Sequence, residues 1–208
     1  MILSPEDGQL YYKLWLPLLK YVNKKYKVNP NLRKMDTARS LDPNKVKEVA
    51  DKLWENVSII DEYLQSAGRN LPEEHKEIIR SWKRSVHGHF MMERHLKKGT
   101  IFISMETEEV YQAIGIISEW EDMFYGAPMP VILRATFMPF KDVIISDGFM
   151  IVLPVMIGSN MKKTFKEIYM DAKKMGGFTE ACRLLLWTCF PSRLIHSRIV
   201  YRTLFHQI

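Results

Sequence analysis

The sequence predicts an α+β protein, in which an N-terminal helical lobe packs on a small antiparallel β-sheet or a partly closed barrel. Two observations support this fold class. Apolar residues recur at helical spacing through the first 85 residues, and short segments of strand character separated by turns follow them. Helical spacing returns after residue 158, so we also expect C-terminal helices.

Three helices are expected in the N-terminal lobe. The first follows Ser4, a good capping residue before proline, and Pro17 is expected to kink it. The second follows Asp42, and its apolar positions recur in steps of three and four as far as Leu64. The third begins at Pro72. This spacing predicts core helices of a small bundle rather than an intermolecular coiled coil.

Five short strands are expected after the helices, at Val86–Leu96, Thr100–Met105, Val110–Ile117, Pro130–Phe140 and Asp142–Ser146. The tripeptide Ser146-Asp147-Gly148 is typical of a turn, so we interpret Asp147 as a turn residue. The apolar segment Phe149–Ile157 after it is consistent with a further, buried strand.

Composition divides the chain into a helical lobe (1–85), an antiparallel sheet with its following helix (86–177) and an atypical tail (178–208). The first 174 residues contain 19 lysines and seven arginines, whereas the last 34 contain four arginines and no lysine. Three interpretations of this basic, apolar tail stay open: a poorly integrated terminus, a packed helix, or a contact with a membrane or a partner.

A cytoplasmic location is expected. No apolar run approaches the ~18–20 residues that a membrane span needs, and the N-terminus lacks the pattern of a secretory signal. Cys182 and Cys189 lie seven positions apart, which is too far for a disulfide within one helix. Free thiols are typical of a reducing compartment.

Positive charge is concentrated where the third helix meets the first strand. The chain has a formal net charge of +6. Its basic stripe, the candidate contact for nucleic acid or another anion, consists of Lys76, Arg80, Lys83, Arg84, Arg94, Lys97 and Lys98. The alternative is an ordinary solvated helix face.

A second candidate site lies at the start of the first strand. His87 and His89 form a His-x-His pair on one strand face, which can chelate zinc, and Glu93 or His95 could supply a third ligand. At ~3.3 Å per residue along a strand, however, His89 and His95 are about 20 Å apart, so these residues cannot all converge on one ion. The alternative is a polar, solvent-facing strand.

Four stretches of the chain carry a family likeness. They are Tyr12-Lys13-Leu14-Trp15-Leu16-Pro17-Leu18-Leu19, Ser40-Leu41-Asp42-Pro43, Glu93-Arg94-His95-Leu96-Lys97-Lys98-Gly99-Thr100-Ile101-Phe102-Ile103 and Val143-Ile144-Ile145-Ser146-Asp147-Gly148. Together they resemble an uncharacterised family of small intracellular bacterial proteins of the Firmicutes type. The resemblance covers residues 5 to 177 and implies no activity. The sequence departs from the family after Gly148.

These observations favour a non-enzymatic intracellular binding or regulatory protein, with nucleic acid, another anion or a protein as its partner and no cofactor. The alternative is a metal-dependent hydrolase with its site near His87 and His89. Neither the partner nor the oligomeric state follows from the sequence.

Overall fold

The computed structural model describes residues 1–30, 42–175 and 178. Four α-helices precede the sheet: α1 (Pro5–Tyr26), α2 (Pro43–Glu55), α3 (Ile59–Gln65) and α4 (Glu73–Ser81), followed by the 3-10 turn η2 (Trp82–Arg84). The strands are β1 (Val86–Leu96), β2 (Gly99–Ser104), β3 (Val110–Ala113), β4 (Val131–Phe140) and β5 (Val143–Val152). A short α5 (Trp120–Met123) lies between β3 and β4, and α6 (Ser159–Lys174) follows the barrel. The predicted α+β class is confirmed.

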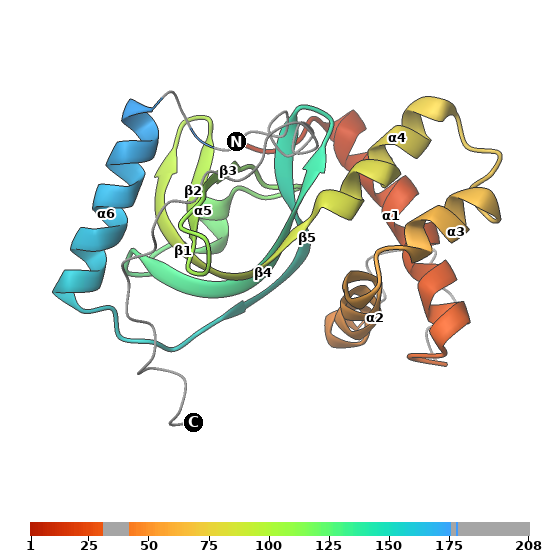
Figure 1. The fold of residues 1–208 in the computed structure, drawn as a ribbon, viewed down its shortest axis with the longest axis horizontal. Coiled ribbons are helices and arrows are strands. Elements are labelled where there is room, and N and C mark those ends of the chain that lie inside the picture. The colour runs from red at the N-terminus through yellow and green to blue at the C-terminus, as the bar shows by residue number, and fades with distance from the viewer. Residues whose placement is uncertain (31–41, 176–177, 179–208) are drawn as a thin grey trace.

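The five strands form a closed barrel in the order β1-β2-β3-β5-β4 (Figure 1). Four of the neighbouring pairs are antiparallel, as predicted, but β3 and β5 run parallel where Ala113 meets Ile144. The sheet is therefore mixed, and this parallel contact closes the barrel. Closure removes the exposed strand edges that an open sheet would have.

Strand β5 continues through the tripeptide that the sequence predicted as a turn. In the register of β4 and β5, Phe137 pairs with Ser146 and Ala135 pairs with Met150. The single residue between them on β4, Thr136, therefore lies opposite three residues of β5, 147–149. This bulge places Gly148 at φ +89°, a conformation that glycine adopts without strain. The turn prediction for Asp147 is therefore wrong: the glycine marks a bulge inside a continuous strand.

The second predicted helix is also corrected, because it is two helices in the structure. Helix α2 ends at Glu55 and α3 begins at Ile59. Between them the Asn56 side-chain oxygen accepts hydrogen bonds from the backbone N–H and the hydroxyl of Ser58, at 3.3 and 2.6 Å. A side chain that binds nearby backbone in this way competes with the helical hydrogen bonds. Helix α1, by contrast, is continuous through Pro17.

The helical lobe and α6 cover different faces of the barrel (Figure 1). The core of the lobe is shared with the barrel, since Leu14 and Trp82 are buried in one cluster with Met138 and Phe140 of β4. The barrel interior is filled mainly by aromatic residues, among them Phe90, Phe102, Phe137 and Trp120. Helix α6 buries Phe165 and Tyr169 against the outer face of β1 and β2.

The predicted tail of residues 178–208 lies outside the described residues apart from Phe178. The Phe178 ring stacks on Tyr169 of α6, with ring centroids 5.5 Å apart.

Candidate functional site

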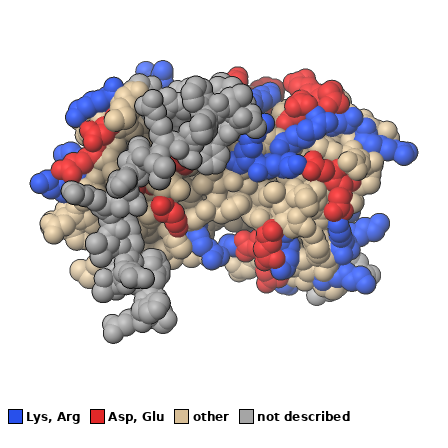
Figure 2. Space-filling model, in the orientation of Figure 1, with Lys and Arg blue, Asp and Glu red and all other residues tan. Residues whose placement is uncertain are grey.

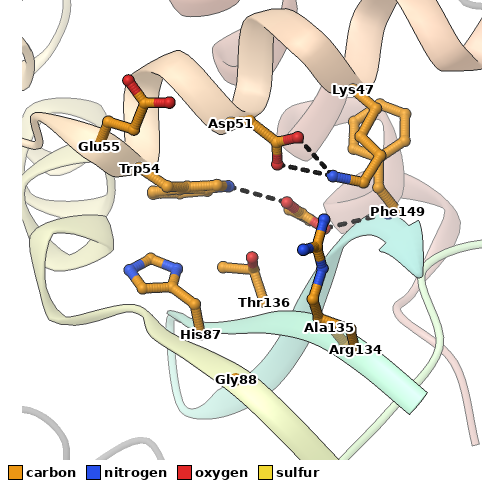
Figure 3. Close-up of a pocket in the computed structure, with 11 residues that line it drawn as sticks. Lys47, Asp51, Trp54, Glu55, His87, Gly88, Arg134, Ala135, Thr136 and Phe149 are labelled. Atoms are coloured by element: carbon orange, nitrogen blue, oxygen red, sulfur yellow. Dashed lines mark hydrogen bonds and ion pairs between the residues drawn. The ribbon is translucent and has the colours of Figure 1, made fainter. Parts of the chain in front are cut away.

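A pocket of about 460 Å³ opens between helix α2 and the outer face of the barrel (Figure 3). Helix α2 supplies four lining residues, and the rest come from β1, β4 and the β5 bulge. The lining residues are Lys47, Asp51, Trp54, Glu55, His87, Gly88, Arg134, Ala135, Thr136, Asp147 and Phe149. The pocket therefore lies where the helical lobe meets the barrel, and eight of its eleven residues can form side-chain hydrogen bonds.

Asp147 forms the buried wall of this pocket, with only 4% of its surface exposed. One carboxylate oxygen accepts a hydrogen bond from the backbone N–H of Phe149 at 3.0 Å. The other accepts from the indole Nε1–H of Trp54 at 2.8 Å. The Tyr11 hydroxyl donates to the Asp147 backbone carbonyl at 3.1 Å. The bulged residue is thus held by α1, by α2 and by its own strand.

Burial raises the pKa of the Asp147 carboxyl to about 6. The hydrogen bonds from Phe149 and Trp54 and the charge of Lys47 act against this rise, and the charge of Asp51 adds to it. No cation lies within ion-pair distance of this carboxylate among the described residues. Such a carboxyl can change its charge close to neutral pH, which is uncommon for aspartate.

Helix α2 presents a charged pair and an aromatic ring to the pocket. Lys47 and Asp51 are one helical turn apart and form an ion pair, with Nζ 2.5 and 2.7 Å from the two carboxylate oxygens. The Trp54 ring stacks on the Trp15 ring of α1, with ring centroids 5.6 Å apart. The centroid of the His87 ring lies 5.7 Å from that of Trp54. Partial burial lowers the pKa of the His87 imidazole, against a smaller opposite effect of Asp51.

Strand β4 contributes Arg134 and Thr136, which share one face because they are two residues apart. Thr136 lies opposite His87 in the register of β1 and β4. The Arg134 guanidinium points from β4 into the pocket (Figure 3). It makes no ion pair or hydrogen bond with any residue that the structure describes. The N–H groups of the Arg134 guanidinium are thus available as hydrogen-bond donors in a pocket that is also lined by the Trp54 ring and the Thr136 hydroxyl.

The helical half of the predicted basic stripe is largely neutralised within the lobe. Lys76 pairs with Glu73 at 3.4 Å, and Arg80 pairs with both Glu73, at 2.8 Å, and Glu77. Lys83 pairs with Asp61 of α3 at 2.6 Å. Figure 2 shows the consequence, since basic and acidic side chains alternate over the helical lobe on the visible face.

The remaining members of the stripe are not brought together into one patch. Arg94 pairs with Glu93 at 2.8 Å, and its guanidinium lies over the Tyr169 ring of α6 at 4.2 Å. Arg84 lies in η2, whereas Lys97 and Lys98 lie in the turn between β1 and β2. These three are exposed and have no ion pair within the described ranges.

The two histidines of the predicted metal site have different neighbours. His87 faces Trp54 in the pocket. His89 binds Glu106, whose carboxylate lies 2.9 Å from His89 Nδ1 and accepts from the His89 backbone N–H at 3.0 Å. In the described part of the chain, no group of three or more His, Cys, Asp and Glu side chains could hold a metal ion.

Sequence reasoning missed most of the pocket. Arg134 could have been identified as a candidate site residue, because it is the only charged residue in the apolar segment 130–140. Asp147 could not, because its neighbours Ser146 and Gly148 are typical of a turn. Lys47, Asp51 and Trp54 have the spacing of one helix face, but that spacing alone is common on solvated helices.

Comparison with known proteins adds no candidate activity: no family model, curated protein or solved structure matches the chain. Within the described residues, no helix is long and apolar enough to cross a membrane.

Proposed function

We propose that this chain is a non-enzymatic, cytoplasmic binding or regulatory protein that recognises a small oxyanion, a carboxylate or a phosphate, in the pocket between α2 and the barrel. The observation that carries the proposal is the Arg134 guanidinium, which points into the pocket without a partner among the described residues. A guanidinium matches the planar geometry of carboxylate and phosphate with two parallel hydrogen bonds.

The surroundings of Arg134 suit a ligand of this class. The Thr136 hydroxyl on the same strand face and the His87 imidazole opposite it are further donors. The volume of about 460 Å³ lies within the usual range of ~300–1,000 Å³ for small-molecule pockets. The Trp54 ring provides apolar surface for the remainder of the ligand. Lys47 contributes less, because Asp51 already neutralises it.

Asp147 restricts which anions fit and at what pH. When ionised, this buried carboxylate repels an anion bound at Arg134, and when protonated it becomes a hydrogen-bond donor. We therefore expect binding to strengthen as the pH falls through about 6, where Asp147 takes up its proton. Protonation of His87 acts in the same direction, at a lower pH than usual because the pKa of His87 is lowered.

The two hypotheses from the sequence have less support from the described residues. The helical cations of the basic stripe are engaged in ion pairs, which reduces the charge available to a nucleic-acid backbone. The His87 and His89 side chains contact Trp54 and Glu106 respectively, and no third metal ligand of the described chain joins them.

A thermal-shift series tests the proposal with inorganic phosphate, acetate and succinate as probes at constant ionic strength. A probe at about 100 times its Kd stabilises the protein by ~2.7 kcal/mol. For a chain of this size, that is a rise of roughly 5–10 °C in Tm. The Arg134→Gln variant should lose this rise, and Arg84→Gln, which removes an exposed arginine outside the pocket, should keep it. If none of the three probes raises Tm, or if both variants respond alike, the proposal is wrong.

A further inference from the structure

Two of the charges that line the pocket between α2 and the barrel have no partner of opposite charge. The Asp, Glu, Lys and Arg residues of the lining are Lys47, Asp51, Glu55, Arg134 and Asp147. Lys47 pairs with Asp51, and Glu55 pairs with Lys52 of the same helix, each at 2.5 Å. Arg134 and Asp147 remain, and neither forms an ion pair within the ranges that the structure describes. The protein therefore leaves one cation and one anion of this pocket uncompensated.

Asp147 needs a counter-charge more than Arg134 does. Arg134 is exposed, so water can solvate its guanidinium. Asp147 is 4% exposed, and its two oxygens accept hydrogen bonds from the Trp54 indole and the Phe149 backbone N–H. Each of these oxygens can accept a second hydrogen bond. A buried carboxylate without a cation is unfavourable, so a cationic group of a ligand would stabilise the ionised form of Asp147.

A single ligand can satisfy both charges. Arg134 and Asp147 lie beyond ion-pair distance of each other, yet both line the same cavity of about 460 Å³. Arg134 comes from β4 and Asp147 from the bulge of the adjacent strand β5. A small molecule that contacts both side chains must therefore be anionic at one end and cationic at the other.

We propose that the ligand of this pocket is a small amino acid, whose carboxylate binds Arg134 and whose ammonium group binds Asp147. This inference rests on the proposed function, because it takes the anion at Arg134 to be the carboxylate of that amino acid. A guanidinium and a carboxylate of the protein then face a carboxylate and an ammonium of the ligand, and the charges cancel.

The charges of the pocket favour this ligand over two others. A phosphate group carries a charge of about −1.5 to −2 at neutral pH, so at Arg134 it would leave surplus negative charge near Asp147. A metal ion is a poorer cation for Asp147, since no group of three or more His, Cys, Asp and Glu side chains in the described chain could hold one.

Ionisation of Asp147 should distinguish an amino acid from a simple carboxylic acid. Ionised Asp147 repels a carboxylate but attracts an ammonium group, and burial raises the pKa of Asp147 to about 6. The preference for an amino acid should therefore increase as the pH rises through this value. Of the other groups around Asp147, Lys47 and Asp51 on α2 form an ion pair. Burial raises the pKa of Tyr11 on α1 and lowers that of His87 on β1, so both are neutral at about pH 7.5.

Isothermal titration calorimetry on the full chain tests the inference with matched pairs of ligands. Each amino acid is compared with the acid that lacks its amine: glycine with acetate, β-alanine with propionate, and 4-aminobutyrate with butyrate. At about pH 7.5, the Kd of at least one amino acid should be at least ~10-fold lower than that of its matched acid, because its ammonium forms a charged hydrogen bond with Asp147. At about pH 5, where Asp147 is protonated, this ratio should shrink toward one.

Two variants test the role of Asp147. Asp147→Asn should abolish the preference for the amino acid at about pH 7.5, because the amide carries no charge. Asp142→Asn, which alters an exposed carboxyl outside the pocket, should keep the wild-type preference. The comparison of matched ligands on the wild-type protein decides the question even if Asp147→Asn does not fold.

The outcomes separate this inference from the proposed function. Binding of the simple acids that depends on Arg134, without tighter binding of any amino acid, overturns the inference and leaves the proposed function intact. A preference that survives in Asp147→Asn, or that does not shrink at the lower pH, also overturns it. If neither series binds, or if both bind Arg134→Gln as tightly as wild type, the proposed function is wrong and this inference with it.

Discussion

Replacement of Asp147 by asparagine should remove a distinct component of the pH dependence of stability. Asp147 is 4% exposed, and burial raises its pKa from 3.8 to about 6. The folded state therefore binds a proton in the window between these values where the unfolded state does not. Protonation of Asp147 therefore stabilises the folded state at low pH. This contribution to the free energy of unfolding falls as the pH rises from about 4 to about 6, and it is constant above about pH 6.

The magnitude follows from the two pKa values. At about pH 4.5 the proton on folded Asp147 adds ~2 kcal/mol to the free energy of unfolding, and at about pH 7 it adds almost nothing. The amide that Asp147→Asn introduces does not titrate in this range, so the variant lacks this component. This amide also has only one oxygen for two donors, Phe149 N–H and Trp54 Nε1–H, and this adds a cost that does not depend on pH.

Urea denaturation of both proteins at about pH 4.5 and about pH 7 measures the effect. The free energy of unfolding of wild type minus that of Asp147→Asn should be ~2 kcal/mol larger at the lower pH. Asp142→Asn, which alters an exposed carboxyl in the turn between β4 and β5, is the matched control. A difference that stays the same at both pH values would show that Asp147 does not hold a raised pKa, and the account of the pocket wall would be wrong.

Three further predictions concern other parts of the structure. Leu14→Ala should lower the free energy of unfolding by about 2–5 kcal/mol, because Leu14 is 1% exposed in the shared core; an unchanged Tm would place α1 outside the core. Trp54→Phe removes the indole donor to Asp147 and should cost about 1–3 kcal/mol. The same variant should move the Asp147 titration, followed by NMR, to higher pH, and an unmoved titration would rule out this hydrogen bond. Neutralising Lys76 and Arg80 to alanine should leave any low-salt retardation of a DNA duplex in gels unchanged, since both cations are already paired; a loss of retardation would restore the nucleic-acid hypothesis.

Most of the fold could be predicted because local patterns determine it. Strand β1 has the predicted bounds, and the cap of α1 at Ser4 forms as its residue types indicate. The sequence predictions are wrong where the same short sequence pattern is compatible with two different structures. Gly148 at positive φ serves a bulge instead of a turn. Asn56 interrupts an apolar spacing that continues across it. The parallel contact of β3 with β5 is set by barrel closure, which no local pattern encodes.

The pocket could not be predicted because it depends on residues that are far apart in the chain. Trp54 and Asp147 are 93 positions apart, and their hydrogen bond exists only once α2 rests on the barrel. The predicted basic stripe shows the reverse problem. Lys76 and Arg80 lie one turn apart on helix α4 and Lys83 follows in η2, but one of the acids that neutralise these three cations, Asp61, comes from a different helix.

The most direct test of the anion site is an NMR titration of ¹⁵N-labelled protein with whichever of phosphate, acetate or succinate stabilises it most. Anion binding at Arg134 predicts saturable shifts of the Trp54 indole N–H, the Gly88 amide and the Arg134 Nε–H, because all three residues line the pocket. The Arg134→Gln protein should show none of these shifts. Shifts that gather instead around Lys76, Arg80 and Arg84, or that survive in Arg134→Gln, would contradict the account.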